Sequence, residues 1–178
     1  MILEHKKLSN LLDSNECRNL FNYALNCKGT GDAQVSKSES FYGDKNFIEI
    51  HKKLLKTIED VVGEKLYPTY CYFRKYKNGA ILYPHKDREA CEVSLSILIG
   101  CDKTWKISFG ESNTVEYDLD VGDGVLYDGV NVMHWRGVFN GEIMVQVFLH
   151  FVRVNGKYSE WAYDKKNYDA YGVKRNDC

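Results

Sequence analysis

The chain has 178 residues, of which 44% are hydrophobic and 28% charged, the proportions of an ordinary soluble domain. Its 24 Lys and Arg residues nearly balance its 25 Asp and Glu residues, so the formal net charge is -1. This balance argues against a protein that acts mainly by neutralising a nucleic-acid backbone. No apolar run approaches the roughly 20 residues that cross a bilayer, and the chain does not begin with the pattern of a signal peptide. We therefore expect a cytoplasmic protein that binds neither nucleic acid nor membrane.

The first part of the chain, residues 1–66, is predicted to be a helical buttress for a later β core, within a single domain spanning 1–178. Asp13 stands three residues before Glu16, which is the pattern of a capping box at a helix N-terminus. A second helix is predicted over 45–62, because its apolar residues recur at steps of three and four. The polar stretch between the two helices is expected to be a connection.

From residue 67 the hydrophobic period changes to two, which indicates β-strands. The strands are predicted at 70–76, 81–83, 93–99, 105–109, 114–119, 124–127 and 144–154. Glycines separate several of these runs, as in hairpin connections. Many short strands behind a helical segment predict a mainly β fold, an antiparallel sandwich or barrel over 67–156. A polar tail over 157–178 follows without a clear period.

The six cysteines are scattered along the chain, and none forms a Cys-x-x-Cys pair. A domain of this length needs no disulfide framework. A structural zinc site usually takes two ligands from one tight turn, so this spacing also argues against one. We therefore predict six free thiols.

Three residues have the types and spacing of a metal site. His85 and Asp87 stand two apart in a segment predicted to be extended, so their side chains point to the same side. His134, later in the β region, is a candidate third ligand. Two histidines and one carboxylate on one face of a metal suit non-haem iron(II). For His134 the alternative is a core histidine paired with a backbone carbonyl, whereas His5 and His51 are predicted to be surface residues.

Residues 70–153 carry several motifs in a fixed order. They are Tyr70-x-Tyr72-x-Arg74-x-Tyr76-Lys77-x-Gly79, Leu82-x-x-His85-x-Asp87-Arg88-x-x-Cys91-Glu92-x-Ser94-x-Ser96, Trp105, Gly122-Asp123, Leu126-Tyr127, His134-Trp135-Arg136 and Gln146-x-Phe148-Leu149-His150-Phe151. In this order they resemble the prolyl-4-hydroxylase-like branch of the Fe(II)- and 2-oxoglutarate-dependent oxygenases, particularly compact members from viruses and microbes. The resemblance implies a double-stranded β-helix, or jelly-roll, flanked by N-terminal helices.

The resemblance also implies an activity. Fe(II) would be held by His85, Asp87 and His134, with 2-oxoglutarate and O2 as co-substrates. Decarboxylation of 2-oxoglutarate to succinate and CO2 would accompany hydroxylation of a C–H bond in a small-molecule or peptide substrate. Peptidyl proline, another protein side chain, a free amino acid and a nucleobase all remain open as substrates. The main alternative is a non-catalytic jelly-roll module that binds a metal or ligand, and a zinc hydrolase is a third possibility.

The expected anchor for 2-oxoglutarate is missing from its usual place. Many members of the resembled family carry a basic residue some nine to fifteen positions after the second histidine, whereas 143–149 here contain no Lys or Arg. A buried dicarboxylate without a cation would be costly. We therefore expect the anchor to be Arg136 or Arg74, with Arg153 as a weaker third candidate.

Several further residues are candidates for the same cavity. Tyr72 and Tyr76 stand two residues before and after Arg74 on the predicted strand, so all three side chains should face the same side of the sheet. Gln146 and His150 alternate with apolar residues on the last long strand and are expected to face the polar cavity. Ser96 is a further cavity candidate, and for His150 the alternative is a satisfied histidine that only lines the cavity.

Overall fold

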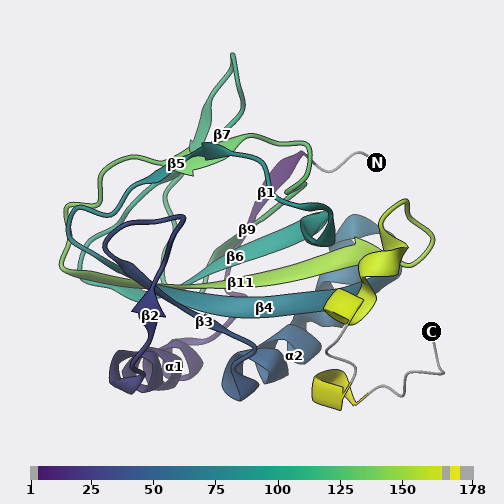
Figure 1. Ribbon diagram of the computed structural model, residues 1–178, viewed down its shortest axis with the longest axis horizontal. Helices are drawn as coiled ribbons and strands as arrows, with labels where there is room; N and C mark the ends of the chain where they lie inside the picture. Colours follow the sequence, from purple (N-terminus) through teal and green to yellow (C-terminus); the bar gives the residue numbers. More distant parts are fainter. Residues whose placement is uncertain (1–3, 166–168, 173–178) are drawn as a thin grey trace.

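The structure is a computed structural model that describes residues 4–165 and 169–172. Its core consists of two antiparallel sheets that face each other (Figure 1). The larger sheet has seven strands in the order β1-β9-β6-β11-β4-β3-β2. Their bounds are β1 His5–Leu8, β2 Thr30–Gly31, β3 Ser38–Tyr42, β4 Leu66–Lys77, β6 Val93–Cys101, β9 Gly124–Tyr127 and β11 Ile143–Arg153.

The smaller sheet has four strands in the order β5-β10-β7-β8. Their bounds are β5 Leu82–His85, β7 Ile107–Phe109, β8 Val115–Tyr117 and β10 His134–Arg136. In the larger sheet the long strand β11 lies between β4 and β6 and pairs with both along most of its length. The two-sheet architecture confirms the prediction of a mainly β fold whose helices precede most of the strands in the chain.

Two helices cover the outer face of the larger sheet, below it in Figure 1. Helix α1 spans Ser14–Asn26 and begins with the predicted capping box at Asp13. Helix α2 spans Lys45–Val62, as predicted, and ends at Gly63, whose φ of 79° is readily adopted only by glycine. No helix in the described part of the chain is long and apolar enough to cross a membrane.

The larger sheet separates two apolar clusters. One lies between this sheet and the helices and includes Phe47, Leu54 and Phe151. The other lies between the two sheets and is rich in aromatic side chains, including Trp105 and Tyr127. Strand residues of β4, β6 and β11 alternate between the two clusters, which explains why these strands are buried on both faces.

The segment predicted to be a helical buttress also contains three strands. Strand β3 pairs with β4, β2 pairs with β3, and β1 pairs with β9. Strands β2 and β3 lie in the stretch that was predicted to be only a connection. These edge strands are short, and pairing with distant segments forms them, so no local hydrophobic period indicates them. The three-residue strand β10 was missed for the same reason.

His51 contradicts the prediction that it lies on the surface. It is fully buried on α2, where its ring meets Phe151 of β11 edge-on at 4.5 Å between centroids. Its Nδ1 lies 2.8 Å from the hydroxyl of Tyr171. A polar residue on the helix face that contacts the sheet can be buried when its ring has an aromatic contact and a hydrogen-bond partner.

The predicted tail contains two 3-10 helices, η2 Ser159–Lys165 and η3 Asp169–Tyr171. Helix η2 packs against β4 (Figure 1). Residues 166–168 and 173–178 of the tail lie outside the described residues, and so does the sixth cysteine, Cys178.

Candidate active site

Pairing between β5 and β10 places two histidines side by side. His85 and His134 are directly opposite in this antiparallel pair, and their ring centroids are 4.3 Å apart. The register then shifts between His134 and Arg136, as at a β-bulge, a feature that redirects side chains near functional sites. Asp87 follows the end of β5, and its backbone N–H donates to the carbonyl of Gly129 at 2.8 Å.

The three predicted ligands converge on one point. Oδ1 of Asp87 lies 3.5 Å from Nε2 of His85, and Oδ2 lies 3.8 Å from Nε2 of His134. One ligand atom from each residue lies within 4.8 Å of the others. This spacing is small enough for a single metal ion to contact all three after minor adjustment.

Hydrogen bonds fix which nitrogen of each histidine faces Asp87. Nδ1 of His85 lies 2.9 Å from the carbonyl of Tyr83, and Nδ1 of His134 lies 3.0 Å from the carbonyl of Val132. A carbonyl can only accept, so both Nδ1 atoms carry a proton and Nε2 is the available ligand atom. Oδ2 of Asp87 is buried and has no hydrogen-bond partner among the described residues. This donor set fits a divalent transition metal.

Electrostatics favour the metal-binding protonation states of two of the three ligands. Burial opposes ionisation of Asp87, but the hydrogen bond with His85 and the charge of His134 outweigh it, so the pKa of Asp87 is lowered. Burial lowers the pKa of His134. Burial also opposes the charged form of His85, but its hydrogen bond with Asp87 outweighs burial and raises the pKa of His85. Asp87 and His134 thus favour the forms that bind a metal, and a metal at this site must displace the proton shared between His85 and Asp87.

Gly129 is a site residue that the sequence analysis missed. A Cβ atom there would lie 2.4 Å from the carbonyl oxygen of Cys91, 2.8 Å from Oδ2 of Asp87 and 2.9 Å from Oγ of Ser94. Only glycine lets this loop approach the carboxylate so closely. In the sequence, Gly129 is marked only as a glycine that follows a predicted strand. Glycines of hairpin turns have the same position, so the sequence alone does not distinguish Gly129 as a site residue.

The predicted ligands share a small cavity with both candidate anchors. Its other walls are largely aromatic and aliphatic. It is lined by Gln34, Tyr72, Arg74, Leu82, His85, Asp87, Ile107, Tyr127, His134, Arg136 and Phe148. The two arginines therefore lie on the same cavity as the candidate metal ligands, as expected.

Arg74 is already paired within the protein. It is buried and forms an ion pair with Asp32 at 2.7 Å. It also donates to Oγ of Ser40 at 3.0 Å, to Oε1 of Gln34 at 3.1 Å and to the hydroxyl of Tyr76 at 3.4 Å. Its charge and most of its donors are thus satisfied by the chain itself.

Arg136 is equally buried but lacks an ion-pair partner among the described residues. Its Nη1 donates to the carbonyl of Trp105, and its guanidinium lies 5.1 Å from the centroid of that ring. Its Nη2 is buried with no hydrogen-bond partner in the described part of the chain. Burial lowers the pKa of Arg136, which expresses the cost of an uncompensated buried cation. An anion in the cavity would relieve that cost.

Of the other residues predicted to face the cavity, one lines it and four lie behind its walls. Tyr72 lines the cavity, whereas Tyr76, Ser96, Gln146 and His150 are buried around it without lining it. Gln146 donates through Nε2 to Oγ of Ser96 at 2.8 Å. The third candidate anchor, Arg153, pairs instead with Glu92 at 2.8 Å and Glu64 at 3.0 Å, and it does not line the cavity.

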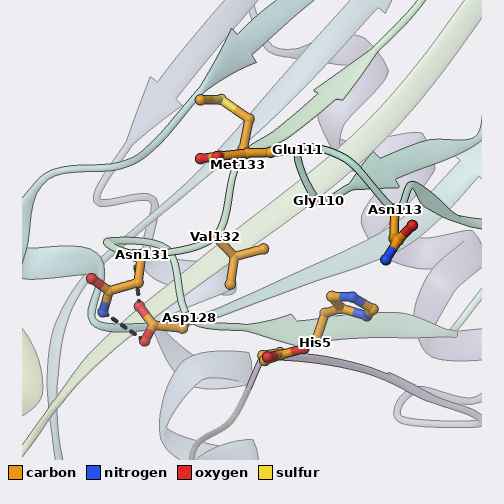
Figure 2. Close-up of a pocket in the computed structure, with 9 residues that line it drawn as sticks. His5, Gly110, Glu111, Asn113, Asp128, Asn131, Val132 and Met133 are labelled. Atoms are coloured by element: carbon orange, nitrogen blue, oxygen red, sulfur yellow. Dashed lines mark hydrogen bonds between the residues drawn. The ribbon is translucent and has the colours of Figure 1, made fainter.

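Another pocket, of about 310 Å³, is formed by different residues (Figure 2). It is lined by Glu4, His5, Gly110, Glu111, Asn113, Asp128, Asn131, Val132 and Met133. Asp128 accepts hydrogen bonds from the backbone and side chain of Asn131, which fixes the loop on one side. The ring of Phe109 stacks on His5 at 5.1 Å and contacts His134 at 5.9 Å. The pocket thus borders the candidate metal site through Phe109 without sharing its residues.

Solved structures that share this fold include enzymes that depend on 2-oxoglutarate or were solved with it bound. SnoN, the epimerase from nogalamycin biosynthesis, superposes with a TM-score of 0.72 at 10% identity, over 85% of this chain and 77% of that one. HygX from Streptomyces hygroscopicus, with nickel and 2-oxoglutarate bound, superposes with a TM-score of 0.71 at 11% identity, over 86% of this chain and 84% of HygX. A prolyl-4-hydroxylase from Pseudomonas putida superposes with a TM-score of 0.65 at 16% identity, over 85% of this chain and 93% of that enzyme.

The sequence itself matches no family model, and no curated protein is significantly similar to it. The structural similarity nevertheless covers most of the chain. The chain therefore has the jelly-roll fold of the 2-oxoglutarate- and iron-dependent oxygenases, which confirms the fold implied by the resemblance.

Proposed function

We propose that the chain is an Fe(II)- and 2-oxoglutarate-dependent oxygenase that hydroxylates a C–H bond of a small molecule or peptide, with succinate and CO2 as co-products. One observation carries the proposal. A single cavity combines three convergent metal ligands with a buried arginine, Arg136, that has no ion-pair partner among the described residues. The shared fold of known 2-oxoglutarate-dependent enzymes supports it.

In this proposal His85, Asp87 and His134 hold the iron through two Nε2 atoms and the carboxylate. When bound, the iron supplies the centre at which 2-oxoglutarate and O2 react and the C–H bond is oxidised. The chain supplies the rigid geometry, because the carbonyls of Tyr83 and Val132 fix both rings. The aromatic and aliphatic cavity walls exclude water from the reaction.

Arg136 is the proposed anchor for the far carboxylate of 2-oxoglutarate. A guanidinium offers parallel donors that match a carboxylate, and its Nη2 is the unpaired donor on this cavity. Arg74 is assigned a different task. Its ion pair with Asp32 ties the connection between β2 and β3 to the cavity wall, where it supports Tyr72.

Anaerobic spectroscopy tests the proposal directly. Addition of Fe(II) and then 2-oxoglutarate should produce a weak visible charge-transfer band. His85→Ala, Asp87→Ala and His134→Ala should each weaken iron binding and abolish the band and turnover, while circular dichroism shows an intact fold. Absence of the band in the folded, iron-loaded wild type would favour the non-catalytic binding module instead.

The shared fold is compatible with several classes of substrate. The structural neighbours include an epimerase, an enzyme solved with hygromycin B and a prolyl-4-hydroxylase, so one fold serves several substrates. Incubation with panels of peptides, amino acids and other small metabolites, followed by mass analysis for an added oxygen atom, should identify the substrate. Succinate release that depends on one panel member would mark it as the substrate.

A further inference from the structure

A second cluster of metal-ligand side chains lies on the other side of Asp87. Asp87, Cys91 and His150 each place one ligand atom within 4.8 Å of the others. Cys91 ends the short helix η1 (Glu89–Cys91), and His150 lies on β11. Both side chains are 98% buried. The cluster is thus formed by three segments, with Cys91 and His150 screened from solvent and Asp87 half-buried.

The hydrogen bonds of His150 show which of its nitrogens can bind a metal. The hydroxyl of Ser94 has one proton, which it donates to the carbonyl of Cys91 at 3.0 Å. The contact of 2.8 Å between that hydroxyl and Nδ1 of His150 therefore has Nδ1 as the donor. Nε2 then carries a free lone pair, and it is buried without a hydrogen-bond partner among the described residues.

The other two ligand atoms lie within reach of the same point, and because burial raises the pKa of the Cys91 thiol, a metal that binds there must displace its proton. Oδ2 of Asp87 is also buried without a hydrogen-bond partner in the described part of the chain. Sγ of Cys91 forms one hydrogen-bond contact within the described residues, with the neutral hydroxyl of Tyr70 at 3.1 Å. Buried polar atoms left unpaired are costly and uncommon. Oδ2 of Asp87 already belongs to the candidate iron site, so the unpaired Nε2 of His150 beside a thiol is the atom that calls for an explanation.

We propose that Asp87, Cys91 and His150 form a second metal site for a zinc-type ion, separate from the iron site but sharing its carboxylate. Sulfur, imidazole nitrogen and carboxylate oxygen are the ligands of tetrahedral zinc. Zinc bonds of about 2.0 to 2.3 Å require ligand atoms less than about 4 Å apart, so an inward movement of about 1 Å closes the site. The soft thiolate distinguishes this site from the His–Asp–His triad.

The shared carboxylate couples the two sites. Asp87 faces His85 and His134 with one oxygen each, so an ion held by Cys91 and His150 must bridge to the triad or draw the carboxylate away. Zinc in the second site therefore weakens iron binding in the first. The scattered cysteines predicted no structural zinc site with two cysteine ligands from one tight turn. Here a single cysteine combines with Asp87, four residues earlier, and with His150 from a strand distant in the sequence.

Cobalt(II) is the probe, because a cobalt–thiolate bond gives a strong near-ultraviolet charge-transfer band. His85→Ala disables the triad and leaves the proposed site intact. With cobalt this variant should show the thiolate band, and the double variant His85→Ala/Cys91→Ser should lose it. The matched control is His85→Ala/Cys71→Ser, because Cys71 is equally buried on the opposite, helix-facing side of the sheet. It should keep the band.

Absence of the band in folded His85→Ala, or its survival after Cys91→Ser, would overturn the proposal. A measurement on the wild type guards against variants that fail to fold. X-ray absorption on protein loaded with two equivalents of zinc should detect sulfur at about 2.3 Å. Nitrogen and oxygen neighbours alone would refute the site. Neither readout depends on 2-oxoglutarate turnover, so the proposed function and this site can fail separately.

Discussion

Two arginines line one cavity, and their partners assign them different tasks. Arg74 is neutralised by Asp32, and its hydrogen bonds to Ser40 and Gln34 are internal to the protein. Within the described residues, Arg136 donates to one carbonyl, lies over an aromatic face and leaves Nη2 without a hydrogen-bond partner. A buried cation gains most from an incoming anion when no internal anion competes.

Arg136→Met should therefore weaken 2-oxoglutarate binding more than Arg74→Met does. Loss of one partner of a buried charge pair typically costs about 2 to 5 kcal/mol, so the apparent dissociation constant should rise at least tenfold, with iron affinity nearly unchanged. Anaerobic titration of the charge-transfer band measures both constants. A larger effect in Arg74→Met would reverse the assignment, and wild-type affinity in both variants would refute a relocated anchor.

His51 links the burial of one side chain to the pH dependence of stability. Burial lowers the pKa of His51 from its ordinary value of 6.5 to about 3. The unfolded chain takes up a proton in this range and the folded chain does not, so protons favour unfolding. The free energy of unfolding should therefore decrease as the pH falls from 6.5 toward 3.

His51→Gln should reduce that pH dependence. Between about pH 6 and pH 4 the slope of the unfolding free energy should fall by up to about 1.4 kcal/mol per pH unit. Denaturant unfolding at several pH values measures it. Tyr171→Phe is the control, because it removes the hydrogen bond to Nδ1 and leaves the ring buried. An unchanged slope in folded His51→Gln would contradict the burial argument.

At the scale of elements, the site is built on the ends of short strands that depend on their neighbours. Strand β10 has only three residues and pairs with both β5 and β7. This double pairing places His134 against His85 on one side and against Phe109 on the other. A strand this short has little stability alone, so the smaller sheet orders the site as a unit.

The two helices are joined through the cap of the second. Asp44 accepts a hydrogen bond from the backbone N–H of Asn46 at 2.9 Å and from the hydroxyl of Tyr23 on α1 at 2.6 Å. Asp44→Ala should lower the free energy of unfolding by about 1 to 2 kcal/mol, because it removes a helix cap and a contact between helices. Chemical denaturation measures this loss.

Tyr23→Phe isolates the second part of that effect. It removes only the bond between the helices at a half-exposed site, so the expected loss is about 0.5 to 1 kcal/mol. A loss as large as that of Asp44→Ala would show that the cap itself contributes little. Metal binding should be unaffected in both variants, because the helices pack on the face of the larger sheet opposite the site.

At the scale of the whole molecule, two apolar clusters on either side of the larger sheet provide the core, and no covalent link is needed to hold it. The five cysteines in the described residues are all free, and three of them are buried. Buried cysteines of this kind pack as small hydrophobic side chains. The sixth, Cys178, lies outside the described residues.

Thiol titration of the denatured, unreduced protein should find six free groups. The reason is that a core of this size is sufficient without disulfides. Protein prepared without added oxidant is the appropriate sample, and a reduced and denatured aliquot provides the full count. Two or more disulfides in the unreduced sample would contradict both the thiol prediction and the expectation of a reducing compartment.

Local patterns were sufficient to predict much of this architecture. The three-and-four spacing in 45–62, the capping box at Asp13 and the change of period near residue 67 each reflect interactions between neighbours in the chain. The spacing of His85 and Asp87 is equally local. Such features need no knowledge of the fold, and the helices and the long strands lie where these patterns place them.

Contacts between distant segments decided the rest. Strand β1 exists because β9 pairs with it, β3 because β4 pairs with it, and β2 because it pairs in turn with β3. His51 is buried because β11 lies beneath its helix. Whether an arginine has a partner depends on what the fold brings to it: Asp32 reaches Arg74, and no carboxylate among the described residues pairs with Arg136. Burial and pairing are properties of the packed chain, so the chemistry of the cavity emerges only when the two sheets close over it.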